Sequence, residues 1–286
     1  MLLEKKVIWA ALKSIFKILF TALLLYLVFN QIDLSQLKNV FKHCQPQFLI
    51  AASIAYLLLI IISSWRLYGY LRDINIEISP ATNLKMYFIG LFYNVFLPGG
   101  LGGEGYKIYL LHKRSKEPVK RIFSAIFFDR LSGLWSIGFI IVVLVILIPH
   151  LAVPALPLAV LFVSGTALYY ILMKKFFADY AQHFFRFHGQ ALVAQSLQML
   201  CVVLILYSQT LSGNFAPYLF GFLLSSLATI VPISVGGFGL REIVMVQGSG
   251  YLNMNAQIAV FTTLSFSLLS TILSLPGLWY IYRLKY

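Results

Sequence analysis

Two short segments of this chain carry nearly the same pattern of proline, glycines and a trailing basic residue. Residues 97–107 read LPGGLGGEGYK and residues 231–241 read VPISVGGFGLR, so the prolines, the glycine pairs and the bases align without gaps. Proline and clustered glycines break helices, yet both segments lie in apolar surroundings. Inside a bilayer, backbone freed in this way must face protein or a water-filled cavity. A matched pair of interrupted apolar segments, one in each half of a chain, points to the binding site of a transporter.

The composition is that of an integral membrane protein. Of the 286 residues, 60% are hydrophobic and only 11% are charged, and the mean hydropathy is +0.86. No polar stretch is long enough for a separate folded domain, so a single membrane domain over residues 1–286 is expected. The net charge of +13 gathers at the ends of apolar runs, which favours an anionic membrane surface over nucleic acid as the partner. No cleavable signal segment is apparent, and two cysteines, Cys44 and Cys201, are too few for a disulfide framework.

Six apolar runs reach the length needed to cross a bilayer core, about 20 residues. The runs lie at about residues 7–29, 48–68, 122–148, 151–173, 188–208 and 256–282. The first is the weakest, because Lys13 and Lys17 interrupt it. The apolar arms that flank Pro98 and Pro232 are too short to cross, so each pair of arms is predicted to form a re-entrant helical hairpin.

These elements predict an all-α fold, a polytopic membrane protein with six full spans and two re-entrant helical hairpins. The order span, span, hairpin, span then occurs twice in opposite directions, which is an inverted-topology repeat of about residues 1–148 and 149–286. Both termini fall on one side, together with most Lys and Arg residues, whereas the other side keeps little beyond Lys38 and Lys42. The positive-inside rule places both termini in the cytoplasm and the protein in the cell inner membrane.

The second helix of each hairpin is expected to begin at the glycines, with its free N–H groups toward mid-membrane. Lys107 and Arg241 fall in the first turns of these helices. A base beside a helix N-terminus suits an anion, and lipid phosphate is the anion expected at this depth. The glycine pairs either allow a headgroup to approach the backbone or only permit tight turns and close helix packing. These glycines are Gly102, Gly103, Gly236 and Gly237.

Two carboxylates accompany these bases. Glu104 and Glu242 either cap their helices and pair with the neighbouring bases, or meet a cationic headgroup or a coupling proton. Both interpretations stay open.

Four more polar residues are candidates for the same site. Asp129 and Arg130 lie one or two turns into the third run, where they either pair with hairpin residues or let Arg130 contribute to a phosphate pocket. Arg66 ends the second run and either anchors it at the interface or contacts a headgroup. Asn94 lies one turn before Pro98 and is expected to cap a helix or bond freed backbone. No metal site is expected, since the histidines show no ligand spacing, and the lack of a P-loop, a dinucleotide fingerprint and a serine nucleophile elbow predicts no cofactor and no catalytic residue.

The segments NVFLPGGLGGEGYK, FFDRLSGL and VPISVGGFGLRE, with the neighbourhood of Trp65 and Arg66, resemble the lysylphosphatidylglycerol synthase transmembrane-domain family over essentially the whole chain. The resemblance implies lipid translocation, with aminoacylated phosphatidylglycerol as the best-known cargo, and relatives are linked to glycolipid, polyprenyl-phosphate and hopanoid pathways. The soluble aminoacyl-transferase domain of the full synthase is not expected in this chain, which leaves the cargo open.

The sequence therefore predicts a flippase-like protein that translocates a phospholipid or other lipid-phosphate across the cytoplasmic membrane. An integral transferase acting on a lipid-phosphate carrier, with Glu104 or Asp129 as the base, is the alternative. A third interpretation is a non-transporting partner that organises a lipid-synthesis complex. The expected partners are membrane lipids, in particular an anionic phospholipid or lipid-phosphate, and a homodimer is compatible with the sequence.

Overall fold

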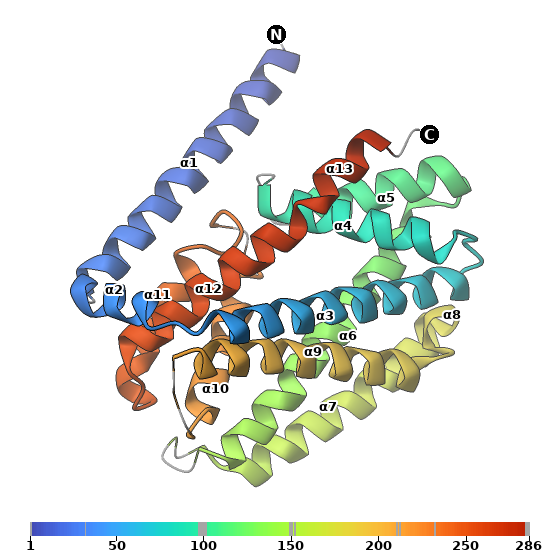
Figure 1. The fold of residues 1–286 in the computed structure, drawn as a ribbon. Coiled ribbons are helices and arrows are strands. Elements are labelled where there is room, and N and C mark those ends of the chain that lie inside the picture. The colour runs from blue at the N-terminus through green and yellow to red at the C-terminus, as the bar shows by residue number, and fades with distance from the viewer. Residues whose placement is uncertain are drawn as a thin grey trace.

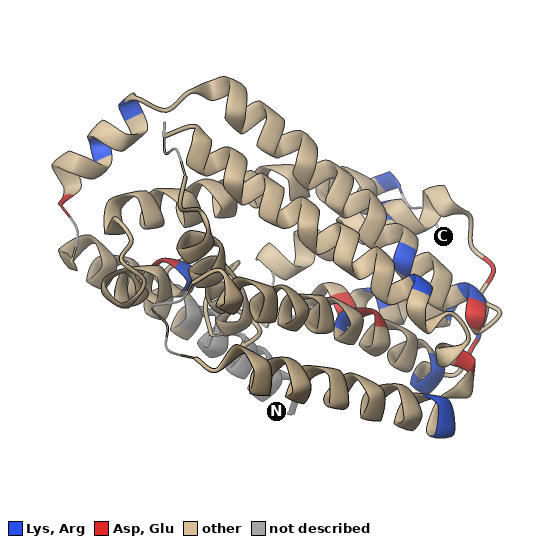
Figure 2. Ribbon diagram, turned by 90° about the horizontal axis from the view of Figure 1, so that it is seen from below, with Lys and Arg blue, Asp and Glu red and all other residues tan. Residues whose placement is uncertain are grey.

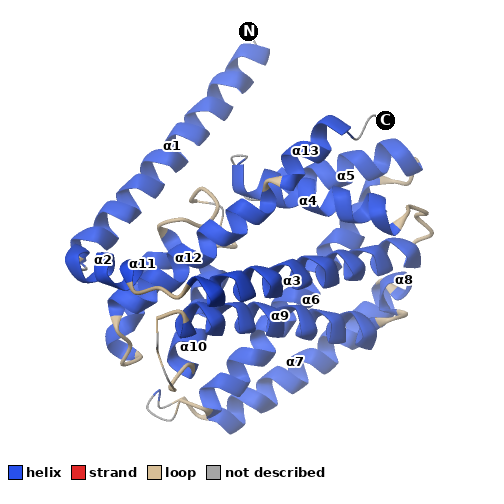
Figure 3. Cartoon of the chain, viewed as in Figure 1, coloured by secondary structure: helices blue, strands red, loops and turns tan. Residues whose placement is uncertain are grey.

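The computed structural model describes residues 2–31, 33–96, 102–148, 151, 153–209, 211, 213–231 and 233–283, and in the first helix it describes side chains at 15, 16 and 18–31. The two prolines of the matched segments, Pro98 and Pro232, lie outside the described residues. The described chain is helical and contains no strand (Figure 3).

The helices form one bundle from which α1 projects (Figure 1). In chain order they are α1 (Leu2–Gln31), α2 (Leu34–Lys42), α3 (Pro46–Asp73), α4 (Pro80–Phe96), α5 (Gly102–Ser115), α6 (Val119–Ile146), α7 (Ala155–Phe176), α8 (Ala178–Ala181), α9 (Phe184–Tyr207), α10 (Ala216–Ala228), α11 (Leu240–Tyr251), α12 (Ala256–Ser274) and α13 (Pro276–Arg283).

Within the described residues, five helical stretches are long and apolar enough to cross a membrane. They correspond to α3, α6, α7, α9 and the stretch Ala256–Arg283, which comprises α12 and α13, with mean hydropathies between 1.8 and 2.3. This confirms a multi-pass membrane protein with five of the six predicted spans. The first predicted span differs, because α1 from Ile18 onward meets α2 at an angle of 94° and counts as a sixth span only if the bent pair is taken together. Asp33 starts the new helix, since its carboxylate accepts a hydrogen bond from the Ser35 amide at 2.8 Å.

The last span contains a break that the hydropathy pattern does not reveal. α12 ends at Ser274 and α13 begins at Pro276, which lacks the amide that would continue the helical bonding. At Gly277 a Cβ atom would overlap the carbonyl oxygen of Phe88. The break therefore lets the backbones of α13 and α4 touch.

Polar contacts define one end of the bundle. His183 Nδ1 lies 3.0 Å from the carboxylate of Asp73, which joins the start of α9 to the end of α3. A guanidinium nitrogen of Arg121 lies 3.6 Å from the carboxylate of Asp179, which joins the start of α6 to α8. The starts of α6 and α9 and the end of α3 thus share this end.

Hydrogen bonds define the opposite end. The Gln45 amide donates to the Ser208 carbonyl at 3.0 Å, joining the start of α3 to the end of α9. The Asn255 amide donates to the Tyr218 hydroxyl at 2.9 Å, joining the start of α12 to α10.

α4 and α5 form one helical hairpin and α10 and α11 form another (Figure 1). The first hairpin lies in the chain between the end of α3 and the start of α6, which share one end of the bundle. The second lies between the end of α9 and the start of α12, which share the other end. The two hairpins therefore connect spans at opposite ends of the bundle.

The two glycine pairs have different structural roles in these hairpins. A Cβ at Gly103 would overlap the carbonyl oxygen of Gly90 and lie 2.7 Å from the Asn94 side chain, so α5 packs backbone to backbone on α4. In the other hairpin, Gly236 and Gly237 have φ angles of +58° and +84°, which favour glycine and form a tight loop before α11. Gly103 thus allows close helix packing, and Gly236 and Gly237 form a tight turn.

Replacing Gly103 by Ala is expected to destabilise the protein by about 1–3 kcal/mol, because the added methyl group forces α4 and α5 apart. A lowered thermal midpoint in detergent would report the change. Gly105→Ala, in the same helix, is the matched control, since no described atom outside its own helical backbone lies within 4 Å of the added Cβ. Equal midpoints for the two variants would contradict the packing.

Candidate functional site

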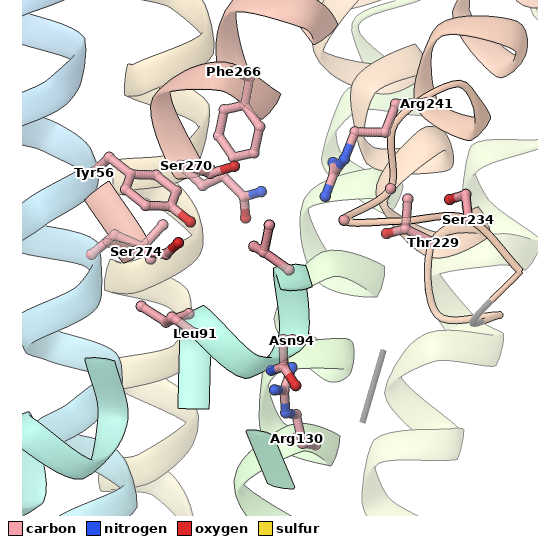
Figure 4. Close-up of a pocket in the computed structure, with 15 residues that line it drawn as sticks. Tyr56, Leu91, Asn94, Arg130, Thr229, Ser234, Arg241, Phe266, Ser270 and Ser274 are labelled. Carbon is pink, nitrogen blue, oxygen red and sulfur yellow. The ribbon is translucent and has the colours of Figure 1, made fainter. Parts of the chain in front are cut away.

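A polar cavity of about 280 Å³ lies among α3, α4, α6, α9, α12 and the loop between α10 and α11. In Figure 4, Arg241 and the loop lie on one side of this space, Ser270 and Ser274 on another, and Asn94 and Arg130 below. The polar side chains that line it are Tyr56, Asn94, Arg130, Gln198, Thr229, Ser234, Arg241, Ser270 and Ser274. The cavity thus joins both hairpins to the spans around them.

Arg241 enters the cavity from the first turn of α11. Its Nη1 donates to the Ser226 hydroxyl at 2.9 Å, and its guanidinium lies 5.5 Å and 5.3 Å from the ring centres of Phe222 and Phe266. Ring faces attract a cation without neutralising it. No ion pair to Arg241 is found among the described residues, so its positive charge stays available to an anion.

Arg130 enters from α6 on another side of the cavity. One guanidinium nitrogen contacts Glu104 Oε1 of the first hairpin, yet 52% of the arginine side chain remains exposed. The pairing of Arg130 with a hairpin residue is therefore observed, and the contribution to a phosphate pocket stays a prediction for a residue that lines the cavity. A planar guanidinium offers several donors, so one bond to Glu104 leaves others for a second anion.

The matched pattern predicts that Lys107 and Arg241 share one polar cavity, but Lys107 does not line the cavity that Arg241 enters. Its ammonium lies 3.5 Å from Glu104 Oε1 and 4.5 Å from the centre of the Tyr87 ring, and the residue is 3% exposed. Glu104 in the preceding turn draws the ammonium inward, and Gly90 leaves space where any Cβ would overlap the lysine Cε. The two aligned bases therefore occupy different environments.

The buried ion pair between Arg66 and Asp129 lies outside the cavity lining. Arg66 Nε donates to Asp129 Oδ1 at 2.8 Å, and the residues are 6% and 3% exposed. The interpretation of Arg66 as an interface anchor is wrong, because the side chain points into the bundle and pairs with α6. Burial also removes Arg66 and Asp129 from contact with a ligand in the cavity.

Asn94 bonds freed backbone, as expected. Its Oδ1 accepts from the Gly103 amide at 2.9 Å, and its Nδ2 donates to Glu104 at 3.4 Å. Glu242 caps its helix, because its Oε2 accepts from the Gly239 amide at 2.6 Å, and it is fully buried.

The two glycine pairs also differ in their position relative to the cavity. Gly236 and Gly237 line it, whereas Gly102 and Gly103 do not. Only the second pair is therefore placed where the backbone could approach a headgroup.

The sequence motifs do not predict several of the residues that line the cavity. Ser270 and Ser274 lie four residues apart on one face of α12, a spacing that the sequence displays but that does not by itself distinguish a cavity wall from helix packing. Gln198 is one of three glutamines on α9, with Gln190 and Gln195, and the sequence alone does not distinguish which of them faces a cavity. Thr229 and Ser234 come from the loop around the second glycine pair.

Replacing Asp129 by Asn should leave the buried Arg66 unpaired and destabilise the protein by about 3–5 kcal/mol. Thermal unfolding in detergent measures this loss, and the apolar double variant Arg66→Met/Asp129→Leu should recover most of it. The control Asp179→Asn removes a pair with Arg121 that is largely exposed, which is worth about 0–1 kcal/mol. Similar losses for the two single variants would show that the Arg66–Asp129 pair is not buried in the membrane.

The family model described as lysylphosphatidylglycerol synthase TM region matches residues 14–277. A comparison with curated proteins finds no match. The family match spans nearly all of the helical bundle, including both hairpins and every residue that lines the cavity. It ties this multi-pass membrane protein to lipid metabolism. The chain therefore belongs to the lysylphosphatidylglycerol synthase transmembrane-region family.

Proposed function

We propose that this protein binds the phosphate of an anionic phospholipid or other lipid-phosphate in the polar cavity and moves the headgroup across the cytoplasmic membrane. The observation that carries the proposal is the convergence of two guanidinium groups, Arg130 and Arg241, on one cavity. Arginine donates several hydrogen bonds in a plane and suits the oxygens of a phosphate. Glu104 is shared between Lys107 and Arg130, and no ion pair to Arg241 is found among the described residues, so this cavity keeps a surplus of positive charge.

The size and surroundings of the cavity favour a lipid headgroup. Its volume of about 280 Å³ is at the lower end for ligand pockets, so it suits a headgroup rather than a whole lipid. The surrounding helices expose many large apolar side chains, among them Ile50, Ile54 and Leu58 on α3. Acyl chains can lie along such surfaces while the headgroup enters the polar space.

The transferase alternative gains no support from its two candidate bases. Asp129 is buried against Arg66, and Glu104 contacts both Lys107 and Arg130. A general base must reach the proton that it removes, and neither carboxylate lines the cavity.

The proposal includes two re-entrant hairpins that belong to an inverted repeat. The hairpins start at opposite ends of the bundle, as an inverted repeat requires. Helix contacts also correspond between the halves: α6 packs on α9 as α12 packs on α3, and α10 packs on α6 as α4 packs on α12. Rocking of one half against the other around the cavity is the motion that such repeats support.

The orientation that we propose has both termini in the cytoplasm and the protein in the cell inner membrane. Lys and Arg residues gather at the end of the molecule near the C-terminus, while the opposite end carries few (Figure 2). The last turns of α3, α5 and α7 all carry basic residues. The positive-inside rule favours this end for the cytoplasm.

Single cysteines introduced by Lys116→Cys, Lys174→Cys and Lys42→Cys, in a background without Cys44 and Cys201, test this topology. A membrane-impermeant thiol reagent should label positions 116 and 174 from the cytoplasmic side and position 42 from the other side. Labelling of 116 and 174 from opposite sides would contradict the hairpin topology.

The double variant Arg130→Gln/Arg241→Gln should lower lipid translocation in proteoliposomes by roughly tenfold or more, because each lost charge-assisted bond to phosphate is worth about 1.5–3 kcal/mol. Arg186→Gln is the control, since Arg186 is exposed at the start of α9. Thermal midpoints of both variants should confirm that they fold. Unchanged translocation by a folded double variant would refute the phosphate role of the two arginines.

A further inference from the structure

We infer that the cavity selects an anionic lipid whose headgroup carries hydroxyl groups and no amine, an inference that rests on the proposed function. The best-known cargo of the family, aminoacylated phosphatidylglycerol, carries amines and is disfavoured by this site. Phosphatidylglycerol itself has the favoured chemistry, a phosphate next to uncharged hydroxyl groups.

The charged side chains that face the cavity are positive. Arg130 and Arg241 are its charged lining residues, and no carboxylate lines it among the residues that the structure describes. The turns at 97–101 and 232, which lie outside that part of the chain, contain no Asp or Glu.

The carboxylates closest in sequence to the lining arginines do not line the cavity, and each has a partner among the described residues. Glu104 contacts Lys107 and Arg130, Asp129 bonds Arg66, and Glu242 caps the Gly239 amide. These three acidic residues are 7%, 3% and 0% exposed. A headgroup ammonium in the cavity would therefore meet two guanidinium groups and no lining carboxylate, and burying an unpaired charge is costly.

Three of the hydroxyl groups in the cavity wall point their hydrogens at backbone carbonyls. Thr229, Ser270 and Ser274 donate their hydroxyl hydrogens to carbonyls of their own helical turns, at 2.7 Å, 2.9 Å and 2.7 Å. Their oxygens keep lone pairs that can accept hydrogen bonds on the cavity side. A ligand with hydroxyl donors satisfies these acceptors.

The positive charge of the two arginines determines which headgroup donor the cavity favours, a hydroxyl or an ammonium. Both a hydroxyl and an ammonium can donate to the acceptors on α12 and beside Thr229. Only the hydroxyl does so without repulsion from Arg130 and Arg241. The arrangement therefore assigns the phosphate to the arginines and uncharged hydroxyls to the serine and threonine wall.

Native mass spectrometry of the purified protein tests the selection with an equimolar mixture of phosphatidylglycerol, phosphatidylethanolamine and lysyl-phosphatidylglycerol that share the same acyl chains. We expect phosphatidylglycerol to be retained over each of the other two by about tenfold, the effect of one unfavourable charge contact. Gln198→Glu, which adds a carboxylate at a lining position without changing shape, should abolish most of this preference. Gln182→Glu, at an exposed position outside the cavity, is the matched control and should leave it unchanged.

The possible outcomes distinguish a failure of the headgroup preference from a failure of the proposed lipid binding. Equal or better retention of either amine-bearing lipid by the wild type would overturn the selection and leave lipid binding intact. An unchanged preference in Gln198→Glu would likewise overturn it, because the preference would then arise outside the cavity. Retention of no lipid above that of an unrelated membrane protein, or displacement of lipid by free glycerol phosphate at similar concentration, would overturn both claims.

Discussion

The cost of placing charge inside an apolar bundle determines how this structure is arranged. Arg66 bonds Asp129, and Glu104 holds Lys107 on one side while it contacts Arg130 on the other. Each buried acid is thus used in pairing or capping, because an isolated charge in this environment is expensive. Glu104 is shared by two bases, and no ion pair to Arg241 is found among the described residues, so net positive charge remains at the cavity that Arg130 and Arg241 line. The surplus is the physical basis for assigning an anion to the site.

The two hairpins use a similar sequence pattern for different purposes. In the first, Gly103 brings α5 onto α4, and the base of the pattern is buried beside Glu104. In the second, Gly236 and Gly237 form a loop in the left-handed region, and the base of the pattern faces the cavity. A repeated sequence pattern therefore gives an asymmetric cavity, in which the base of one hairpin is buried beside Glu104 and the base of the other faces the cavity.

The spans and the local contacts were predictable from sequence, because hydropathy and short spacings encode them. Apolar runs gave five of the membrane-spanning stretches, and the capping by Glu242 and the pairing of Glu104 with Lys107 act over three residues. The partnership of Arg66 with Asp129 was not predictable, since it joins helices that are far apart in the chain. The same holds for the cavity wall that contains Gln198, because which face of an apolar helix meets a cavity depends on tertiary packing.

The most direct test of the account is a cryo-electron microscopy structure of the protein in nanodiscs that contain phosphatidylglycerol. The account predicts density for a lipid whose phosphate lies between the guanidinium groups of Arg130 and Arg241, with its acyl chains against the outer surface of the bundle. A cavity that holds only water while ordered lipid phosphates lie elsewhere would contradict it.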